Sequence, residues 1–427
     1  MAIQIVPRRP VAPDEKAVFN KHVCPPEFGG GPIDPIGADG TPVVHIREGD
    51  TCPNAPGKTI IRHLRRNLLV DFDLKLPDGS KVDMWIIEDP DDEKGGKVFP
   101  SKRIRVCEGD VIHAEVGSSG DTHTIHWHGI EPSTMNDGVG KLSFELGDFT
   151  YQWRAGCAGT YVYHCHKNTV LHFIRGLFGL LLIDPPKPSG ATGPDPPYPD
   201  GGPGFARRQN DVVRYDVEQW LLAGEIDTRW TELGHNAFMQ ECDRDNPVAP
   251  KNFTQDGFLN DFCPDVFFVA GVKGKMGVAR VDRQGCRLPR IPASLNYPAV
   301  AVTAKVNDTI LLRVENTGYT IKQYRFGRPE DRGKLDMEII AMDGRPLGYR
   351  GCSSQFSAPF RIEAGSLLPL PVGPLTSARR FDLLIRPRAV GTFPVQIEFY
   401  DWRATFRDSQ PDRNFLYATA STTINIA

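Results

Sequence analysis

Two short stretches of the 427-residue chain hold six of its eleven histidines. Residues 121–129 read DTHTIHWHG, and residues 163–177 read YHCHKNTVLHFIRGL. Neutral imidazole is a common metal ligand, and a cysteine thiolate is a soft ligand that favours copper or zinc. Burying several imidazoles together without a metal would leave donors or acceptors unpaired, at roughly 1–3 kcal/mol each. The pattern therefore predicts a metal site.

The spacing of these residues predicts two ligand sets. Side chains alternate between the two faces of a strand, so residues two apart share a face. One face would hold four imidazoles, those of His126, His128, His164 and His166. Cys165 would point to the opposite face, where His123 and His172 from flanking loops can join it. Two imidazoles and a thiolate form the trigonal set of blue, type 1 copper, and four imidazoles suit further copper.

Zinc is the chemical alternative to copper at these residues. A structural zinc site closes with four ligands and would not need seven candidates on two faces, so copper is the prediction. The other five histidines are scattered, and each is expected to be an ordinary surface or core residue. They are His22, His45, His63, His113 and His235.

Eight cysteines remain besides Cys165. They are Cys24, Cys52, Cys107, Cys157, Cys242, Cys263, Cys286 and Cys352. An even number permits four disulfides and an oxidising compartment, and buried thiols are an equal alternative. They contain no C-x-x-C pair, so a second metal site of that kind is not indicated.

The segments around the histidines read as β-strands. Short stretches rich in β-branched and aromatic residues, bounded by Gly and Asp turns, occupy residues 103–116, 149–155, 160–166 and 177–183. The same pattern recurs after residue 300. Composition agrees, because 42 Gly and 37 Pro are many for a helical protein but ordinary for sheets joined by turns. We predict an all-β chain of two β-sandwiches.

The domain boundary is predicted from a proline-rich segment. Residues 184–204 contain eight prolines, which exclude a helix or a central strand. A chain of this length also exceeds one hydrophobic core. We therefore expect a copper-binding domain over residues 1–184, whose first 98 or so residues form an N-terminal extension. A linker over residues 185–204 and a second domain without a copper motif over residues 205–427 would follow.

Several function classes are disfavoured by charge and hydropathy. The formal net charge is −3 with no long basic block, so nucleic acid is not an expected partner. No apolar run approaches the roughly 18 residues of a membrane span. The chain as given has no signal peptide. Localisation is left open, with a periplasmic or secreted protein expected if a signal was removed and a cytoplasmic one otherwise.

The motifs resemble the cupredoxin domains of multicopper oxidases, the laccase-like family, and the resemblance implies that the two sandwiches are cupredoxin-like Greek-key β-sandwiches. HWHGIEPSTMNDG at residues 126–138 is similar to the first-domain motif of that family, and AGTYVYHCH at residues 158–166 looks like its GTYWYHSH strand with Cys in place of Ser. H-x-x-H-x-H-G and H-C-H resemble the copper-loaded terminal domain. Residues 339–347 and 378–387 resemble the copper-free middle domain, so the likeness covers about residues 100–427.

The resemblance implies roles for individual residues. A type 1 copper site with a non-coordinating axial leucine, which should raise the reduction potential, would be formed by His123, Cys165, His172 and Leu177. The catalytic multinuclear site would use His126 for type 2 copper and, for type 3 copper, His128, His164 and His166. Cys165, bonded to two of these histidines, would carry electrons to it. His172 follows Cys165 by seven residues instead of the family's five, so the ligand loop is longer here.

The number of histidines predicts an assembly. In the family, a trinuclear centre takes eight histidines from two domains, and after residue 184 this chain has only His235. A two-fold contact between two first domains would bring two four-histidine faces together and restore eight. We predict a homo-oligomer, with a dimer favoured, that oxidises a small-molecule or metal-ion reductant and reduces dioxygen. The alternatives are a nitrite-reductase-like two-copper enzyme that uses His235 of a neighbour, and a one-copper electron-transfer protein.

Overall fold

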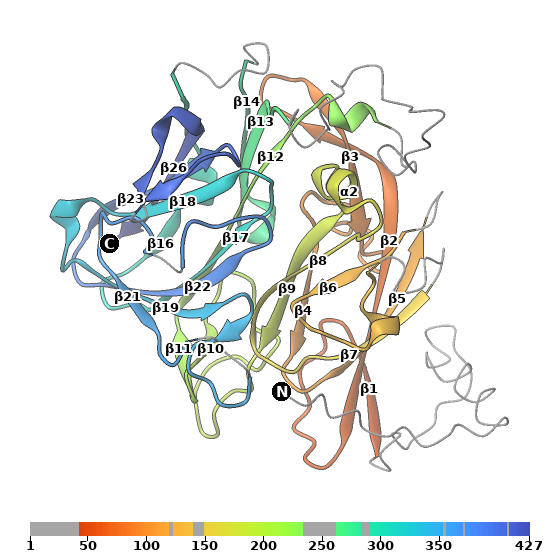
Figure 1. Cartoon of the computed structure of the whole chain (residues 1–427). Coiled ribbons are helices and arrows are strands. Elements are labelled where there is room, and N and C mark those ends of the chain that lie inside the picture. Colours follow the sequence, from red (N-terminus) through yellow and green to blue (C-terminus); the bar gives the residue numbers. More distant parts are fainter. Residues whose placement is uncertain are drawn as a thin grey trace.

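The computed structural model describes residues 42–118, 123–139, 149–233, 262–282, 291–352, 356–369, 372–407 and 410–427. Over these ranges strands predominate, and they form two β-sandwiches that lie side by side (Figure 1). The all-β prediction is confirmed. None of the helices in these ranges is long and apolar enough to cross a membrane. Outside the described residues lie His22, Cys24, His235, Cys242 and Cys286.

The first sandwich packs two sheets formed before residue 185. One sheet has the order β1-β2-β5-β7, with β3 paired to β2, and the other has the order β4-β9-β8-β6. The strands are β1 (Val43–Arg47), β2 (Thr59–Lys75), β3 (Lys81–Glu88), β4 (Ser101–Cys107), β5 (Val111–Ser118), β6 (His126–His128), β7 (Phe149–Arg154), β8 (Gly159–His164) and β9 (Phe178–Asp184). The described part of the N-terminal extension is thus paired into this sandwich, because it supplies β1, β2 and β3.

The second sandwich follows the proline-rich segment. Its larger sheet has the order β14-β13-β12-β17-β22-β19-β20 with β21 on β19, and its smaller sheet has the order β15-β26-β23-β18 with β16 on β26. The strands are β12 (Val217–Ile226), β13 (Val266–Ala270), β14 (Met276–Arg280), β15 (Ala293–Asn296), β16 (Val302–Ala304), β17 (Ile310–Asn316), β18 (Ile321–Phe326), β19 (Leu335–Met342), β20 (Arg345–Pro346), β21 (Phe360–Ile362), β22 (Arg380–Pro387), β23 (Gly391–Tyr400) and β26 (Leu416–Ile426).

Short elements complete the described fold. Two hairpins lie outside the main sheets: β10 (Gly204–Arg208) with β11 (Asp211–Tyr215), and β24 (Phe406–Arg407) with β25 (Gln410–Pro411). The α-helix is α2 (Thr169–Ile174). The 3-10 turns are η2 (Thr134–Asn136), η3 (Trp230–Glu232), η5 (Val272–Gly274), η6 (Pro298–Val300), η7 (Pro329–Asp331) and η8 (Arg413–Phe415).

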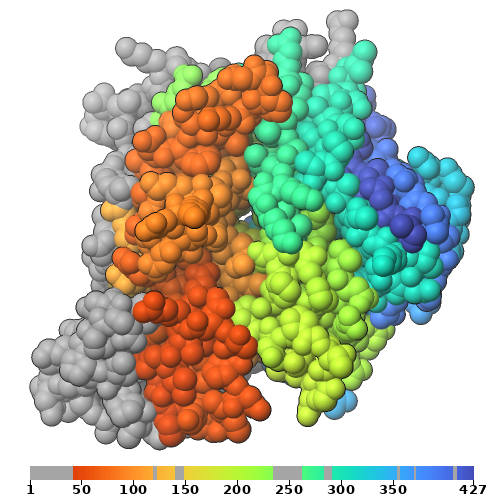
Figure 2. Space-filling view, turned by 180° about the vertical axis from the view of Figure 1, so that it is seen from behind, coloured from red at the N-terminus to blue at the C-terminus, as the bar shows by residue number. Residues whose placement is uncertain are grey.

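Strand β9, FGLLLID, is apolar from Phe178 to Ile183, and its packing explains why. Leu181 and Ile183 pack into the core between the two sheets of the first sandwich. The alternate residues, Leu180 and Leu182, face the other way and pack against Trp220 of the second sandwich. A strand covered on both faces needs no polar alternation. Figure 2 shows the same close apposition from behind, with the early part of the chain lying along the segments that follow residue 184.

Disulfides tie these parts together. Cys52 pairs with Cys107 within the first sandwich, and Cys157 pairs with Cys352, which links the two sandwiches covalently. Cys263 is buried and belongs to neither of these two pairs. Among the described cysteines, therefore, both alternatives left open by the sequence occur.

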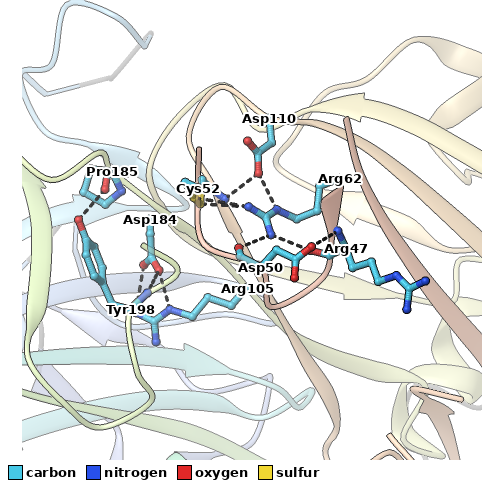
Figure 3. The surroundings of a disulfide bond; sticks show 10 residues. Arg47, Asp50, Cys52, Arg62, Arg105, Asp110, Asp184, Pro185 and Tyr198 are labelled. Atoms are coloured by element: carbon cyan, nitrogen blue, oxygen red, sulfur yellow. Dashed lines mark hydrogen bonds and ion pairs between the residues drawn. A yellow bond between two sulfur atoms is a disulfide. The ribbon is translucent and has the colours of Figure 1, made fainter. Parts of the chain in front are cut away.

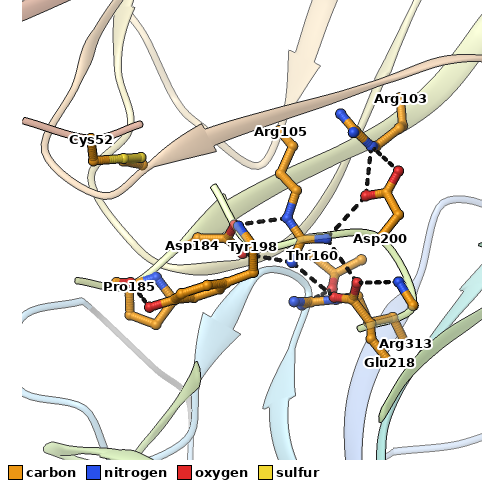
Figure 4. A network of polar contacts seen from close by, with 12 residues as sticks. Cys52, Arg103, Arg105, Thr160, Asp184, Pro185, Tyr198, Asp200, Glu218 and Arg313 are labelled. Atoms are coloured by element: carbon orange, nitrogen blue, oxygen red, sulfur yellow. Dashed lines mark hydrogen bonds and ion pairs between the residues drawn. A yellow bond between two sulfur atoms is a disulfide. The ribbon is translucent and has the colours of Figure 1, made fainter. Parts of the chain in front are cut away.

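A buried ionic network also joins the sandwiches (Figure 4). The guanidinium of Arg105 on β4 bonds the carboxylate of Asp184 at 2.7 and 3.0 Å and that of Glu218 on β12 at 2.7 and 3.1 Å. Glu218 also accepts a 2.8 Å bond from Arg313 on β17. Burial alone would raise the pKa of Glu218, but the two guanidinium groups overcome it and hold the pKa at about 2. Glu218 is therefore ionised at neutral pH and compensates two buried cations.

Glu218→Gln should destabilise the protein by about 3–5 kcal/mol, because it leaves Arg105 and Arg313 without their shared counter-charge. Urea unfolding at pH 7 measures the loss. The matched control is Glu330→Gln, whose carboxylate lies 3.9 Å from Arg328 with both side chains exposed; it should change the free energy of unfolding by about 1 kcal/mol or less. Equal effects of the two substitutions would contradict the structural role assigned to the network.

Candidate metal centre

Strand pairing places three of the four predicted cluster histidines together. β6 runs antiparallel to β8, with His126 opposite His164 and His128 opposite Val162. Residues opposite each other in a sheet share a face, so these three imidazoles project from the same side. Trp127, between the two histidines of β6, points into the core of the first sandwich. The alternation predicted from the HWH motif is therefore the alternation observed.

The imidazole of His126 contacts the other three. The ring of His126 lies 5.2 Å from those of His128 and His166 and 5.3 Å from that of His164, measured between centroids. His126, His128 and His164 each have one ring nitrogen that lies within 4.8 Å of the chosen nitrogens of the other two. These nitrogens are close enough to share a metal ion or to bind neighbouring ions.

Hydrogen bonds to carbonyl groups fix the orientation of two of these rings. Nδ1 of His126 lies 2.8 Å from the backbone oxygen of Asp137, and Nδ1 of His164 lies 2.9 Å from that of Cys165. A carbonyl oxygen only accepts, so each Nδ1 carries the proton and each Nε2 keeps its lone pair for a metal. The Nε2 atom of His164 is 3.3 Å from Nδ1 of His128, so these two atoms point to the same place.

His128, His164 and His166 are held in the neutral form that binds metals. Burial, followed by the charge of Arg380, lowers the pKa of His128 to about 3. Burial also lowers the pKa of His164 and of His166, and the neighbouring His126 adds to the effect. Metal ions bind deprotonated imidazole, so these rings need not lose a proton at neutral pH.

The second ligand set forms around Cys165, on the side of the chain segment 164–166 that faces away from the four-histidine cluster. Its sulfur lies 3.5 Å from Nδ1 of His123 and 3.2 Å from Nδ1 of His172. One possible ligand atom of each of these three residues lies within 4.8 Å of those of the other two. All three residues are buried, Cys165 and His172 completely. Leu177 is buried in the same hydrophobic cluster as Cys165, and its carbonyl accepts a 3.0 Å bond from the Cys165 amide.

The longer ligand loop is accommodated by a helical turn. After Cys165 the chain passes through Asn168, in a left-handed conformation (φ 45°), and then forms α2. His172 lies inside this helix, where the sequence predicted a loop. The helix turns the His172 ring back toward the sulfur, so the two additional residues do not separate the ligands.

Several neighbours of the site carry no signal in the sequence. Trp85 on β3 packs its ring 5.1 Å from His172 and 6.2 Å from His123. Arg175 stacks over Trp85 at 4.1 Å and bonds Asp83 at 2.6 Å. Because Trp85 precedes Cys165 by 80 residues, only the pairing of β3 into the first sandwich brings it to the site.

The donor set fits copper. Two imidazole nitrogens and one sulfur meet in a buried pocket, and three further imidazole nitrogens meet on the other side of the same short segment. A third group of possible donors, Cys52, Cys107 and Asp110, does not fit a metal, because its sulfurs are joined in a disulfide. The buried guanidinium of Arg62 also bonds Asp110 and both sulfurs (Figure 3).

A buried acid, Glu315, lies on the strand next to Arg380, the arginine that contacts the four-histidine cluster. Arg380 on β22 donates to the backbone oxygen of His128 at 3.2 Å and pairs in register with Glu315 on β17. Neither carboxyl oxygen of Glu315 has a hydrogen-bond partner among the described residues. Burial raises the pKa of Glu315 to about 8, although Arg380 lowers it in part. The folded protein therefore keeps this group protonated at neutral pH.

Glu315→Gln should stabilise the protein at pH 8 by up to about 4 kcal/mol and have little effect near pH 4.5. Between these values the unfolded chain ionises Glu315 while the folded protein retains the proton, so wild-type stability falls as the pH rises; glutamine removes this dependence. Urea unfolding of both proteins at pH 4.5 and pH 8 measures it, with Glu330→Gln as the exposed control. A difference that is the same at both pH values would contradict the buried neutral acid.

Comparisons with known proteins agree with the motifs. The multicopper oxidase family model matches residues 95–188. Multicopper oxidase MCE of Talaromyces pinophilus is 34% identical over 137 residues, which are 30% of this chain and 21% of that protein. L-ascorbate oxidase of Cucumis sativus is 36% identical over 97 residues, 21% of this chain and 16% of that protein. The match thus spans about a fifth of the length of these relatives.

A solved structure supports the fold over most of the chain. The blue copper oxidase of Nitrosomonas europaea superposes with a TM-score of 0.50 at 19% identity and covers 86% of each chain. At this identity the likeness concerns the fold, and the cupredoxin-like fold class implied by the resemblance is confirmed. Copper is the metal of the family whose model matches, in agreement with the predicted cofactor. Residues 95–188, which contain every predicted ligand, therefore form a domain of the multicopper oxidase family.

Proposed function

We propose that the protein is a copper-dependent oxidoreductase that takes single electrons from a small-molecule or metal-ion reductant and passes them to dioxygen. The observation that carries the proposal is the placement of two donor sets on opposite sides of one peptide segment, His164 to His166. His123, Cys165 and His172 would hold type 1 copper, and Leu177, buried in the same hydrophobic cluster as Cys165, would lie near it without binding. Type 2 and type 3 copper would be held by His126, His128, His164 and His166.

The protein's own groups would contribute orientation and a short route between the sites. Copper, when bound, supplies one-electron transfer and the reduction of dioxygen. The carbonyls of Asp137 and Cys165 would keep the rings of His126 and His164 in the ligand tautomer. Cys165 is covalently bonded to His164 and His166, which provides a continuous path from the sulfur to the imidazole cluster.

Access to the type 1 site is restricted. His172 is fully buried, and Trp85, which packs against both predicted histidine ligands, is only 5% exposed. A reductant would therefore give its electrons from outside a protein layer that includes Trp85, without touching the metal. Small organic reductants and metal ions both satisfy this condition.

We place the oxygen-reducing centre between subunits. Four histidines are half of the set that a trinuclear centre uses, and His126, His128 and His166 are half-buried instead of sealed in the core. Two copies of this face related by a two-fold axis would supply eight imidazoles. The predicted dimer is thus part of the active site.

Copper content per chain, together with molar mass in solution, tests this proposal. A dimer with about 2.5 copper ions per chain supports two type 1 sites and one shared three-copper centre. A value of about 2 would favour the nitrite-reductase-like arrangement, in which His235 of a neighbour completes a type 2 site. A monomer with about one ion would reduce the protein to an electron carrier, and the oxidase proposal would be wrong.

A further inference from the structure

The helix that carries His172 lies between the two sandwiches. Leu171 and Phe173 of α2 belong to a buried hydrophobic cluster that contains residues of both, such as Met84 on β3 and Ile226 on β12. Every predicted copper ligand precedes the proline-rich segment, so the second sandwich supplies none of them. It nevertheless forms part of the surroundings of the helix from which one of these ligands projects.

Tyr319, in the turn between β17 and β18, holds the first turn of α2. Its hydroxyl donates to the backbone oxygen of Val170 at 2.5 Å and lies 3.3 Å from that of Thr169. Its ring stacks on that of Phe173, with the centroids 6.4 Å apart. One side chain of the second sandwich therefore contacts the helix on both sides of His172 in the chain.

The turn that presents Tyr319 is fixed by a buried carboxylate, that of Glu225 on β12. Glu225 is 1% exposed, and it accepts bonds from the backbone nitrogens of Tyr319 at 2.5 Å and Thr320 at 2.7 Å. The ammonium group of Lys322 pairs with the same carboxylate, and both side chains are fully buried. A Cβ atom on Gly318 would lie only 2.4 Å from the Glu225 oxygens, so glycine allows the turn to close over this group. These charge-assisted bonds hold the backbone at Tyr319 in place, and the hydroxyl with it.

A second contact holds the other end of α2. Arg175, the residue that follows the helix, donates to the backbone oxygen of Leu233, just after η3, at 2.6 Å. The helix also connects the two ligand sets, because the ring of Phe173 lies 5.4 Å from that of His164 in an edge-to-face contact. A movement of α2 would therefore displace His172 directly and His164 through Phe173.

We propose that Tyr319 is a positioning residue of the predicted type 1 copper site. By clamping α2 against the second sandwich, it sets how the imidazole of His172 meets the sulfur of Cys165, which lies 3.2 Å from its Nδ1. A helix of six residues is not stable by itself, so α2 depends on such contacts for its place. Groups that orient a metal ligand tune the affinity and the potential of the metal. The role at copper rests on the proposed function, whereas the clamp on α2 is a property of the fold and is testable without copper.

Hydrogen exchange of the full-length, copper-free chain tests the clamp. Tyr319→Phe removes only the hydroxyl, so the protein should fold, and the amides of Leu171 and His172, which are bonded in the first turn of the helix, should exchange roughly 2- to 10-fold faster. The matched control is Tyr297→Phe, which removes a 2.7 Å bond from a buried tyrosine to the backbone oxygen of Phe267 in the second sandwich. It should leave exchange in α2 at the wild-type rate. Equal exchange of these amides in the two variants would overturn the clamp.

The copper-loaded full chain tests the positioning role. Tyr319→Phe should shift the blue absorption band and the reduction potential, while Tyr297→Phe should keep both at wild-type values although it loses a bond of the same kind. A Tyr319→Phe protein with faster exchange in α2 but an unchanged blue band and potential would overturn the positioning role. A wild-type chain that is colourless when loaded with copper would overturn the type 1 site of the proposed function; the exchange rates of the copper-free variants would still support or overturn the clamp.

Discussion

Cys165→Ser should abolish the blue colour and the oxidation of any reductant together. The blue absorption of type 1 copper depends on a cysteine thiolate, and a serine hydroxyl stays protonated and binds copper poorly. Substituting even the hydrogen-bond partners of metal ligands typically costs about 10–100-fold, so the fall in kcat on losing the ligand should be larger still. Visible absorption and steady-state oxidation of a phenolic reductant measure the two effects.

The matched control is Cys263→Ser, which replaces a second buried cysteine outside the two described disulfides. Cys263 lies next to β13 in the second sandwich, and its replacement should leave the colour and the rate unchanged. A Cys165→Ser protein that stayed blue would place type 1 copper elsewhere. A colourless Cys165→Ser protein that still oxidised reductant at the wild-type rate would separate the sulfur from the activity and contradict the proposed electron path.

His126→Ala should keep the blue colour and stop oxygen reduction. His126 contacts the rings of three other cluster histidines but belongs to a different ligand set from Cys165. Its loss should remove copper from the multinuclear centre and lower oxygen consumption by more than the roughly 10–100-fold expected for an outer partner. Oxygen-electrode rates, copper content and absorption on the same samples distinguish loss at the cluster from loss of the whole protein.

Met135→Ala is the control for this substitution. Met135 lies on η2, close to His126 in the chain, and its side chain is exposed. Its replacement should leave copper content and oxygen consumption at wild-type values. If His126→Ala retained full oxidase activity, the shared centre would be wrong, and the imidazole face would have to be explained without oxygen chemistry.

Substantial parts of the fold and site were predictable because they depend on local periodicity. A strand alternates its side chains at every residue, so HWH specifies that His126 and His128 share a face wherever the strand lies. The apolar run that became β9 and the proline-rich segment after it were equally local signals. The type of metal was also predictable from nearby residues, because a cysteine thiolate beside imidazoles favours only a few metal ions.

The remaining features depend on contacts between distant residues. The sequence offered His172 as a loop ligand, and only the folded chain shows that a helical turn brings its Nδ1 to 3.2 Å from the sulfur. Trp85 was not predicted at all, because a tryptophan in a strand usually belongs to the core and nothing in MWIIE distinguishes it. The pairing of Cys157 with Cys352 spans 195 positions and likewise could not be read from spacing.

The sequence by itself determined the strand class, the types of the candidate ligands and the shared face of His126 and His128, since all three follow from neighbours within a few residues. Only the tertiary structure decided that His123 reaches Cys165, that Trp85 covers the site and that Tyr319 holds α2. Sheet register controls these contacts, and register is set by packing over the whole sandwich. A side chain's direction is a local property of the backbone, whereas its neighbours are a property of the entire fold.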